Sequence, residues 1–279
     1  MTHTGHYSEI AVPVADAWEA DRLIYQLSER GFDGFFEDDG VLKAYIPTAK
    51  WHNSLLEGLT HNDGRPLRYT LRRIAPQNWN SEWEKHFPPV TIDGRIHIRA
   101  AFHPPAPKGL LEILIMPKMS FGTGHHETTE LMIRLLADTD LSGKTLIDMG
   151  SGTGVLAIQA EKTCAEKIFA IDNDEWAYEN MKENIRANGC RRIQSFRGGS
   201  EVLEALPEAD VFLANINLNI ILDNLPFYMK KVKRDGRLIL SGFYETDLPA
   251  VRRMLPEDEW EPGRRAVKNR WIGIEFVRK

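Results

Sequence analysis

Apolar residues in the first quarter of the chain follow two different periods. After Asp16, which suits a helix N-cap, they return at the i, i+3, i+4 and i+7 spacing of a helix with one buried face. Short apolar runs on either side of Asp38-Asp39-Gly40 indicate a hairpin. The predicted order is strand 8–14, helix 16–31, hairpin 35–46, short helix 50–59 and strand 67–74. This β-α-β-β-α-β order is typical of a small ferredoxin-like α+β domain, expected here at residues 1–75.

From residue 125 onward, helical and strand-like segments alternate regularly. The predicted elements are helix 126–137, strand 144–149, helix 154–163, strand 167–172, helix 175–188, strands 192–197 and 209–214, helix 217–232, strand 236–242, helix 247–255 and late strands at 259–266 and 271–277. Repeated strand–helix units predict a parallel sheet with helices on both faces, completed by an antiparallel pair. We therefore expect an α/β, Rossmann-like catalytic domain.

The segment between these two parts has a different composition. Residues 76–90 contain three prolines and one helix-like stretch at 81–87, which predicts a linker with a short helix. Two pieces that follow, 95–100 and 111–116, are expected to be extended. The catalytic domain is accordingly predicted at residues 91–279.

A glycine-rich loop, Asp148-Met149-Gly150-Ser151-Gly152-Thr153-Gly154, lies between a predicted buried strand and a predicted helix. Glycines at such a place allow a tight turn and a close approach of a ligand to the backbone. Asp172 ends the next predicted strand, where a carboxylate can accept both hydroxyls of a ribose, so a nucleoside-bearing cofactor is indicated. The G-x-G-x-G spacing fits neither a dinucleotide fingerprint nor a P-loop. The alternative is a flexible loop without a ligand.

A second glycine-containing loop, Phe121-Gly122-Thr123-Gly124-His125-His126-Glu127-Thr128-Thr129, precedes this domain's first helix. Its composition suggests a loop that closes over a ligand, with threonine hydroxyls bonding a carboxylate or an amino group. The two histidines and the glutamate also invite a metal site, but the H-E-x-x-H spacing fails because position 130 is Glu. No metal is therefore expected.

The strand at 209–214 runs into Ala214-Asn215-Ile216-Asn217. Ligands bind at the carboxyl ends of parallel strands, so Asn215 is a candidate site residue. An amide oxygen can orient an amine without acting as a strong base. The alternative is that Asn217 or Asn219 caps the following helix.

Composition limits where the protein is expected to be located and what kinds of partner it is expected to bind. The chain has 279 residues, a formal net charge of −5 and two cysteines, too few for a disulfide framework. Neither an 18-residue apolar run nor a secretory signal is visible, so a cytoplasmic protein without membrane contact is expected. The first 40 residues hold nine acids against two arginines, which favours a basic protein partner over DNA. An ordinary solvated acidic face is the alternative.

The loop D-M-G-S-G-T-G resembles the first motif of S-adenosylmethionine (SAM)-dependent methyltransferases. Together with F-G-T-G-H-H-E-T-T, A-I-D-N-D and A-N-I-N, it makes the chain resemble the ribosomal protein L-eleven methyltransferases (PrmA) from about residue 79 onward. The resemblance implies a class I SAM methyltransferase that trimethylates lysine side chains and the N-terminal α-amine of the large-subunit ribosomal protein L-eleven. It also implies that the small N-terminal domain recognises this substrate. A monomer is expected.

The resemblance also implies site residues. Asn215 is the candidate catalytic residue, and the positions that match SAM-binding ones are Thr129, Gly150, Asp172 and Asn215, with Thr123, Gly152 and Asn173 as weaker additions. The chain departs from relatives at His125 and Glu127, where Thr and Pro are common. An RNA or small-molecule SAM methyltransferase and a non-catalytic SAM-binding partner of the ribosome remain alternatives.

Overall fold

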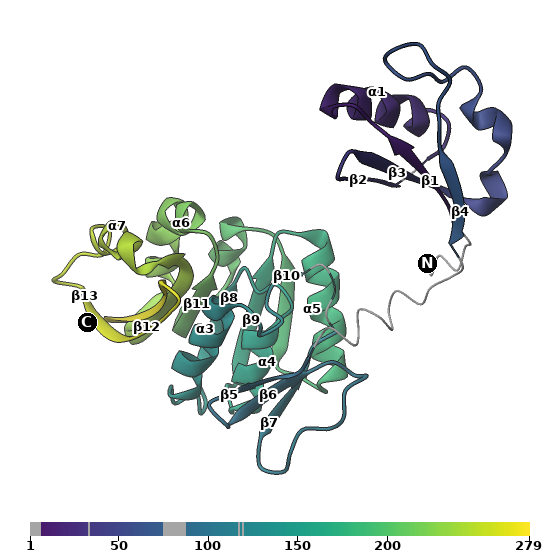
Figure 1. Ribbon diagram of the computed structural model, residues 1–279. Coiled ribbons are helices and arrows are strands. Elements are labelled where there is room, and N and C mark those ends of the chain that lie inside the picture. Colours follow the sequence, from purple (N-terminus) through teal and green to yellow (C-terminus); the bar gives the residue numbers. More distant parts are fainter. Residues whose placement is uncertain (1–6, 33, 75–87, 117, 119) are drawn as a thin grey trace. The chain divides into compact units, whose positions relative to one another are not determined.

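The computed structural model describes residues 7–32, 34–74, 88–116, 118 and 120–279 (Figure 1). The chain divides into two compact units, Met1–His86 and Phe87–Lys279. Each unit has hydrophobic core clusters of its own. The linker helix predicted at 81–87 lies outside the described residues. Among the described residues, no helix is both long and apolar enough to cross a membrane.

The first unit is a four-stranded antiparallel sheet with one long helix. Its elements are β1 (Tyr7–Pro13), α1 (Ala17–Ser28), β2 (Gly34–Asp38), β3 (Val41–Pro47) and β4 (Thr70–Ile74), and the strand order is β2-β3-β1-β4. Strand residues alternate between buried and partly exposed, and the buried ones pack with Leu23 and Leu27 of α1. As predicted, Asp16 caps α1 by accepting a hydrogen bond from the backbone N–H of Glu19 at 2.8 Å. The order is the ferredoxin-like one.

The second helix predicted for this unit is wrong. Residues 50–59 instead contain the 3₁₀ turn η2 (Asn53–Leu56), which follows another short turn, η1 (Thr48–Lys50). Trp51 has extended backbone angles between the two turns, and Glu57 is extended after the second. Leu56 and Leu59 reach the core from this irregular path. Tertiary burial of these leucines therefore replaces the helix that their local spacing predicted.

The second unit is built on a seven-stranded sheet. Its strands are β8 (Thr145–Met149), β9 (Lys167–Asp172), β10 (Ile193–Arg197), β11 (Ala209–Asn215), β12 (Val232–Tyr244), β13 (Trp260–Lys268) and β14 (Trp271–Arg278), in the order β10-β9-β8-β11-β12-β14-β13. The first five in this order are parallel, and β14 is antiparallel to both β12 and β13. The predicted parallel sheet with a late antiparallel pair is confirmed.

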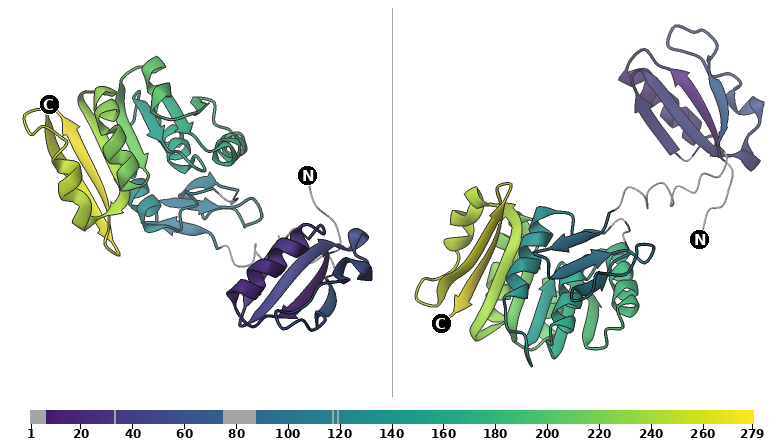
Figure 2. Two further views of the ribbon diagram at one scale, coloured as in Figure 1. Left: turned by 90° about the horizontal axis from the view of Figure 1, so that it is seen from above. Right: turned by 60° about the horizontal axis from the view of Figure 1, so that its bottom comes forward.

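Helices cover both faces of this sheet, as the two views of Figure 2 show. The helices are α3 (Glu127–Ala137), α4 (Val155–Lys162), α5 (Glu175–Ala187), α6 (Leu218–Lys230) and α7 (Leu248–Arg252). Successive side chains of β8 point to opposite faces of the sheet, because Leu146 packs in one core cluster and Ile147 in the other. Nearly continuous apolar strands of this kind are expected where both faces are buried. Strand β12 is longer than predicted and α7 is shorter.

A separate three-stranded sheet precedes α3. It consists of β5 (Val90–Ile92), β6 (Ile96–Arg99) and β7 (Leu111–Leu114), in that order, so the extended pieces expected near 95–100 and 111–116 are strands. Its Ile98 lies so close to Gly124 that a Cβ on this glycine would be 2.6 Å from Ile98 Cδ1. The small sheet therefore supports the loop that leads into α3 and toward the site.

Candidate functional site

Three neighbouring strands of the large sheet end at one cavity. The parallel registers pair Met149 with Ile171 on one side and with Ala214 on the other, so Gly150, Asp172 and Asn215 follow at the same edge. All three line a cavity of about 990 Å³. Carboxyl ends of parallel strands are the usual place for a ligand in this architecture. The structure thus brings together the residues that the three motifs supplied.

The glycine loop after β8 packs closely against two other segments. A Cβ on Gly150 would lie 2.2 Å from Ile216 Cγ2, and a Cβ on Gly152 would lie 2.3 Å from the Phe121 carbonyl oxygen. Gly152 also has a φ of +57°, which favours glycine. The glycine loop can therefore pass between the 121–129 loop and the β11–α6 connection only because Gly150 and Gly152 carry no side chain.

Asp172 is held at the end of β9 by two backbone hydrogen bonds. Its Oδ2 accepts the N–H of Gly152 at 2.8 Å and its Oδ1 accepts the N–H of Asp174 at 3.0 Å. The side chain is largely buried, and this burial raises the pKa of the carboxyl despite the two backbone donors. Each carboxylate oxygen retains a lone pair, so the group can accept both hydroxyls of a ribose. Asn173 and the exposed Trp176 also line this end of the cavity.

Asp148 is a second buried carboxyl that was not singled out from the sequence as a site residue. Only 1% of it is exposed, and its Oδ2 accepts a hydrogen bond from Ser151 Oγ at 2.5 Å. Its Oδ1 has no hydrogen-bond partner among the described residues. Burial, reinforced by the charge of Asp172, raises the pKa of Asp148 to about 7. The carboxyl can therefore hold a proton near neutral pH.

Asn215 presents an unpaired amide oxygen at the end of β11. Its Nδ2 lies 3.5 Å from Thr129 Oγ1, whereas its Oδ1 is buried and has no partner in the described part of the chain. Burying an unpaired acceptor is unfavourable, so such an atom is a natural partner for an N–H of a ligand. Asn217 occupies the N-cap position of α6 without a side-chain capping bond, so the predicted capping role is not seen there. It lines the cavity instead.

The loop at 121–129 contributes a different threonine than expected. Thr128 lines the cavity, while Thr129 is buried beside Asn215. Thr123 is not among the lining residues, and its hydroxyl lies 3.2 Å from His125 Nδ1. His126 begins α3 by accepting the Thr128 N–H at 3.2 Å. The threonine that faces the cavity is thus set by the first turn of α3.

No metal site is formed by the histidines and the glutamate of this loop as described. His126 caps α3, and Glu127 accepts a hydrogen bond from Asn269 Nδ2 at 2.9 Å. Within the described ranges, no group of three or more His, Cys, Asp or Glu side chains is arranged to hold a metal ion.

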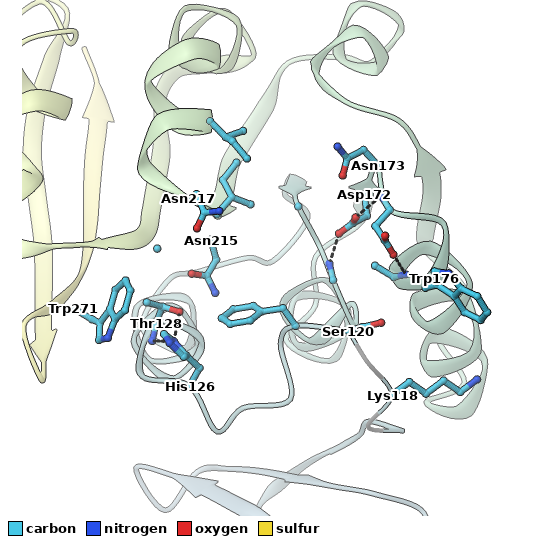
Figure 3. A pocket seen from close by; sticks show the side chains of 18 residues that line it. Lys118, Ser120, His126, Thr128, Asp172, Asn173, Trp176, Asn215, Asn217 and Trp271 are labelled. Carbon is cyan, nitrogen blue, oxygen red and sulfur yellow. Dashed lines mark hydrogen bonds between the residues drawn. The ribbon is translucent and has the colours of Figure 1, made fainter. Parts of the chain in front are cut away.

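Aromatic side chains line the cavity at both ends. Figure 3 shows Asp172, Asn173 and Trp176 at one end, Thr128, His126 and Trp271 at the other, and Asn215 between them. Trp271 comes from β14, the last strand of the chain. No motif marks Trp176 or Trp271, because neither belongs to a glycine loop or a polar strand end. Only the folded chain reveals them as site residues.

Comparison with known proteins agrees with this geometry. The family model described as ribosomal protein L11 methyltransferase (PrmA) matches residues 11–279. The chain belongs to this family. A ribosomal protein L11 methyltransferase of Bacteroides fragilis is 41% identical over 261 residues, covering 92% of this chain and 93% of the relative. One of Chlorobaculum tepidum is 36% identical over 270 residues, with 92% and 93% covered.

A solved structure of the same family supports the fold. The ribosomal protein L11 methylase of Lactobacillus delbrueckii subsp. bulgaricus is 27% identical and superimposes with a TM-score of 0.63. The match covers 69% of this chain and all of that one. The PrmA resemblance, the class I methyltransferase fold and the assignment as a methyltransferase are confirmed.

Proposed function

We propose that this PrmA-family protein binds SAM and transfers its methyl groups to amines of ribosomal protein L11. The observation that carries the proposal is that Asn215, whose buried Oδ1 has no partner among the described residues, lines one cavity with Asp172. Asp172, which suits a nucleoside, and Asn215, which suits an amine, therefore line the same cavity. Such proximity is what a direct transfer between two bound molecules requires.

The residues present fit SAM. The Asp172 carboxylate has free lone pairs for the ribose hydroxyls, and Asn173 and Trp176 line the same end of the cavity. Gly150 and Gly152 leave the backbone bare beneath the space that runs toward Asn215. We assign Asp172, Asn173, Gly150 and Gly152 to the cofactor, with Thr129 acting through its contact with Asn215. Thr123 supports the loop rather than the ligand.

The chemistry that SAM supplies is a methyl group on a positively charged sulfur. An amine can accept it only through a free lone pair, so the acceptor nitrogen must be neutral when it reacts. Asn215 Oδ1 can accept one N–H of that amine and so direct its lone pair, without removing a proton itself. Asn215 is therefore proposed as the residue that orients the acceptor.

We further propose that the first unit recognises L11 and that several amines, lysine side chains and the N-terminal α-amine, become trimethylated. The first 40 residues carry a charge of −7, which suits a basic protein surface. Residues 41–75 hold six basic and two acidic side chains, so the excess of acidic residues lies within the first 40 residues. Domain limits at 1–75, 76–90 and 91–279 are part of this proposal.

Labelled methyl transfer tests the proposed substrate. With tritiated SAM, the protein should label purified L11 and leave ribosomal RNA unlabelled. Label in RNA alone would reject the protein substrate, and SAM binding without label in either would identify a non-catalytic binding protein.

Replacing the orienting amide tests the proposed role of Asn215. Asn215→Ala should lower the rate of L11 methylation about tenfold, the value of one hydrogen bond of about 1.4 kcal/mol, with little change in SAM affinity. Asn219→Ala is the matched control, because Asn219 is exposed on α6 and does not line the cavity. Equal rates for both variants would remove Asn215 from the proposed role.

A further inference from the structure

Three aromatic side chains that line the cavity contact one another and form a wall. The ring of His126 lies between the other two, with centroid distances of 5.1 Å to Phe121 and 5.0 Å to Trp271. Tyr244 packs against Trp271 at 4.3 Å but does not line the cavity. Figure 3 shows His126 and Trp271 beside Thr128, on the Asn215 side of the pocket. We call Phe121, His126 and Trp271 the aromatic wall.

We propose that the aromatic wall is an acceptor subsite for alkylammonium groups and that it retains a partly methylated amine for the next transfer. The inference rests on the proposed function. Its chemical basis is that aromatic faces attract a cationic or methylated nitrogen without needing an N–H bond from it. The subsite therefore accepts the same nitrogen at each stage of methylation.

Hydrogen bonding alone cannot hold the acceptor through three transfers. Each transfer forms one N–C bond and breaks the C–S bond, whose electron pair stays on sulfur, and the nitrogen then releases a proton to water if it carries one. A neutral primary amine has two N–H groups, a monomethyl amine has one and a dimethyl amine has none. Asn215 Oδ1 thus loses its partner before the last transfer. The aromatic wall gains apolar contact as each methyl is added.

Contacts with neighbouring residues hold rings of the wall in place. The ring of His126 is anchored at the start of α3, because its Nδ1 accepts the backbone N–H of Thr128 at 3.2 Å. Glu127, the next residue, is directed to Asn269. The wall therefore offers aromatic rings held in fixed positions, and such rings attract a cationic nitrogen.

Product analysis tests the retention. Mass spectrometry of L11 during the reaction should show wild-type product running to the trimethyl form. In Trp271→Ala, mono- and dimethyl forms should accumulate, with the rate of the third transfer relative to the first lowered about 3- to 30-fold, the range that a cation–π contact supplies. Trp271→Phe should stay within about threefold of wild type, because it keeps an aromatic face. Phe227→Ala, which removes an exposed aromatic on α6 outside the cavity, is the control.

A binding measurement separates this inference from the proposed function. Nε-trimethyl-lysine should bind the wild-type protein and Trp271→Phe, and should bind Trp271→Ala at least threefold more weakly while SAM affinity is retained. Wild type that fails to methylate L11 rejects the proposed function. The aromatic subsite is overturned by any of three results. These are wild-type protein that stops at the monomethyl product, wild-type protein that fails to bind Nε-trimethyl-lysine, or the same product ratio for wild type and Trp271→Ala.

Discussion

The carboxyls of Asp148 and Asp172 are both buried at the cofactor end of the site, yet they are stabilised differently. Asp172 accepts two backbone N–H bonds, whereas one oxygen of Asp148 has no partner among the described residues. Burial therefore raises the pKa of Asp148 from 3.8 to about 7, and the negative charge of Asp172 adds to this increase. A carboxyl with such a pKa makes stability depend on pH near neutrality.

This dependence predicts the behaviour of Asp148→Asn. Between pH 4 and pH 7 the folded wild-type protein keeps a proton that the unfolded chain has lost, so wild-type stability falls as pH rises through this window. The asparagine does not titrate. The unfolding free energy of the variant minus that of wild type should thus increase from pH 4 to pH 8, by up to about 4 kcal/mol for a shift of this size. Urea denaturation at both pH values measures it, and a difference that stays constant contradicts the prediction.

At the scale of elements, the site depends on how closely three loops pack at the carboxyl ends of the strands. Gly152 links the loop after β8 to Phe121 and donates its N–H to Asp172. A similar backbone conformation occurs at Gly189 after α5, where φ is +68° and a Cβ would meet nothing within 4 Å. Substitutions at Gly189 would therefore cause backbone strain alone, whereas substitutions at Gly152 would cause the same strain and also disturb the packing of the loop.

Alanine substitutions at these two glycines should differ in effect. Gly189→Ala should cost about 1–2 kcal/mol of stability, the strain of a left-handed L-residue, with SAM binding unchanged. Gly152→Ala carries the same strain and also places a methyl group 2.3 Å from a carbonyl oxygen, so it should destabilise more and abolish SAM binding. Thermal unfolding and calorimetry compare the pair. Equal losses in both variants would show that the loop contact has no role.

At the scale of the whole molecule, the chain consists of two units with separate cores. The first core is built from β1, α1, β3 and the 3₁₀ turn η2 with nearby Phe32 and Leu59, and the large-sheet cores contain only residues of the second unit. Among the described residues, all those that line the 990 Å³ cavity belong to the second unit. This separation is consistent with the proposal that cofactor binding and substrate recognition belong to different parts of the chain.

Removing the first unit tests this division. A protein lacking residues 1–86 should fold and bind SAM with wild-type affinity, because the cavity and its supporting cores are retained. Its methylation of L11 should fall by at least about tenfold, since the proposed recognition surface is gone and each factor of ten equals about 1.4 kcal/mol of binding free energy. Circular dichroism and calorimetry check the fold and the cofactor. A truncated protein that methylates L11 at the full rate would assign the first unit another role.

Local sequence determined the features that depend on short-range spacing. Short stretches of sequence are enough to predict these features. They are the Asp16 cap, the apolar alternation of the strands and the order of glycine loop, strand and Asp172. Because parallel strands end at one edge, the motifs also predicted that Gly150, Asp172 and Asn215 would meet. Cofactor class and fold followed from that order.

Only the tertiary structure decided the features that depend on contacts between distant segments. Burial of Leu56 and Leu59 replaced a predicted helix with 3₁₀ turns, and Thr128 rather than Thr129 came to face the cavity. The raised pKa of Asp148 arises from complete burial, which composition does not reveal. Trp271 meets His126 because β14 inserts antiparallel between β12 and β13, and no local pattern records that pairing. Trp271 therefore joins the motif residue His126 in the cavity wall through strand order rather than through a motif of its own.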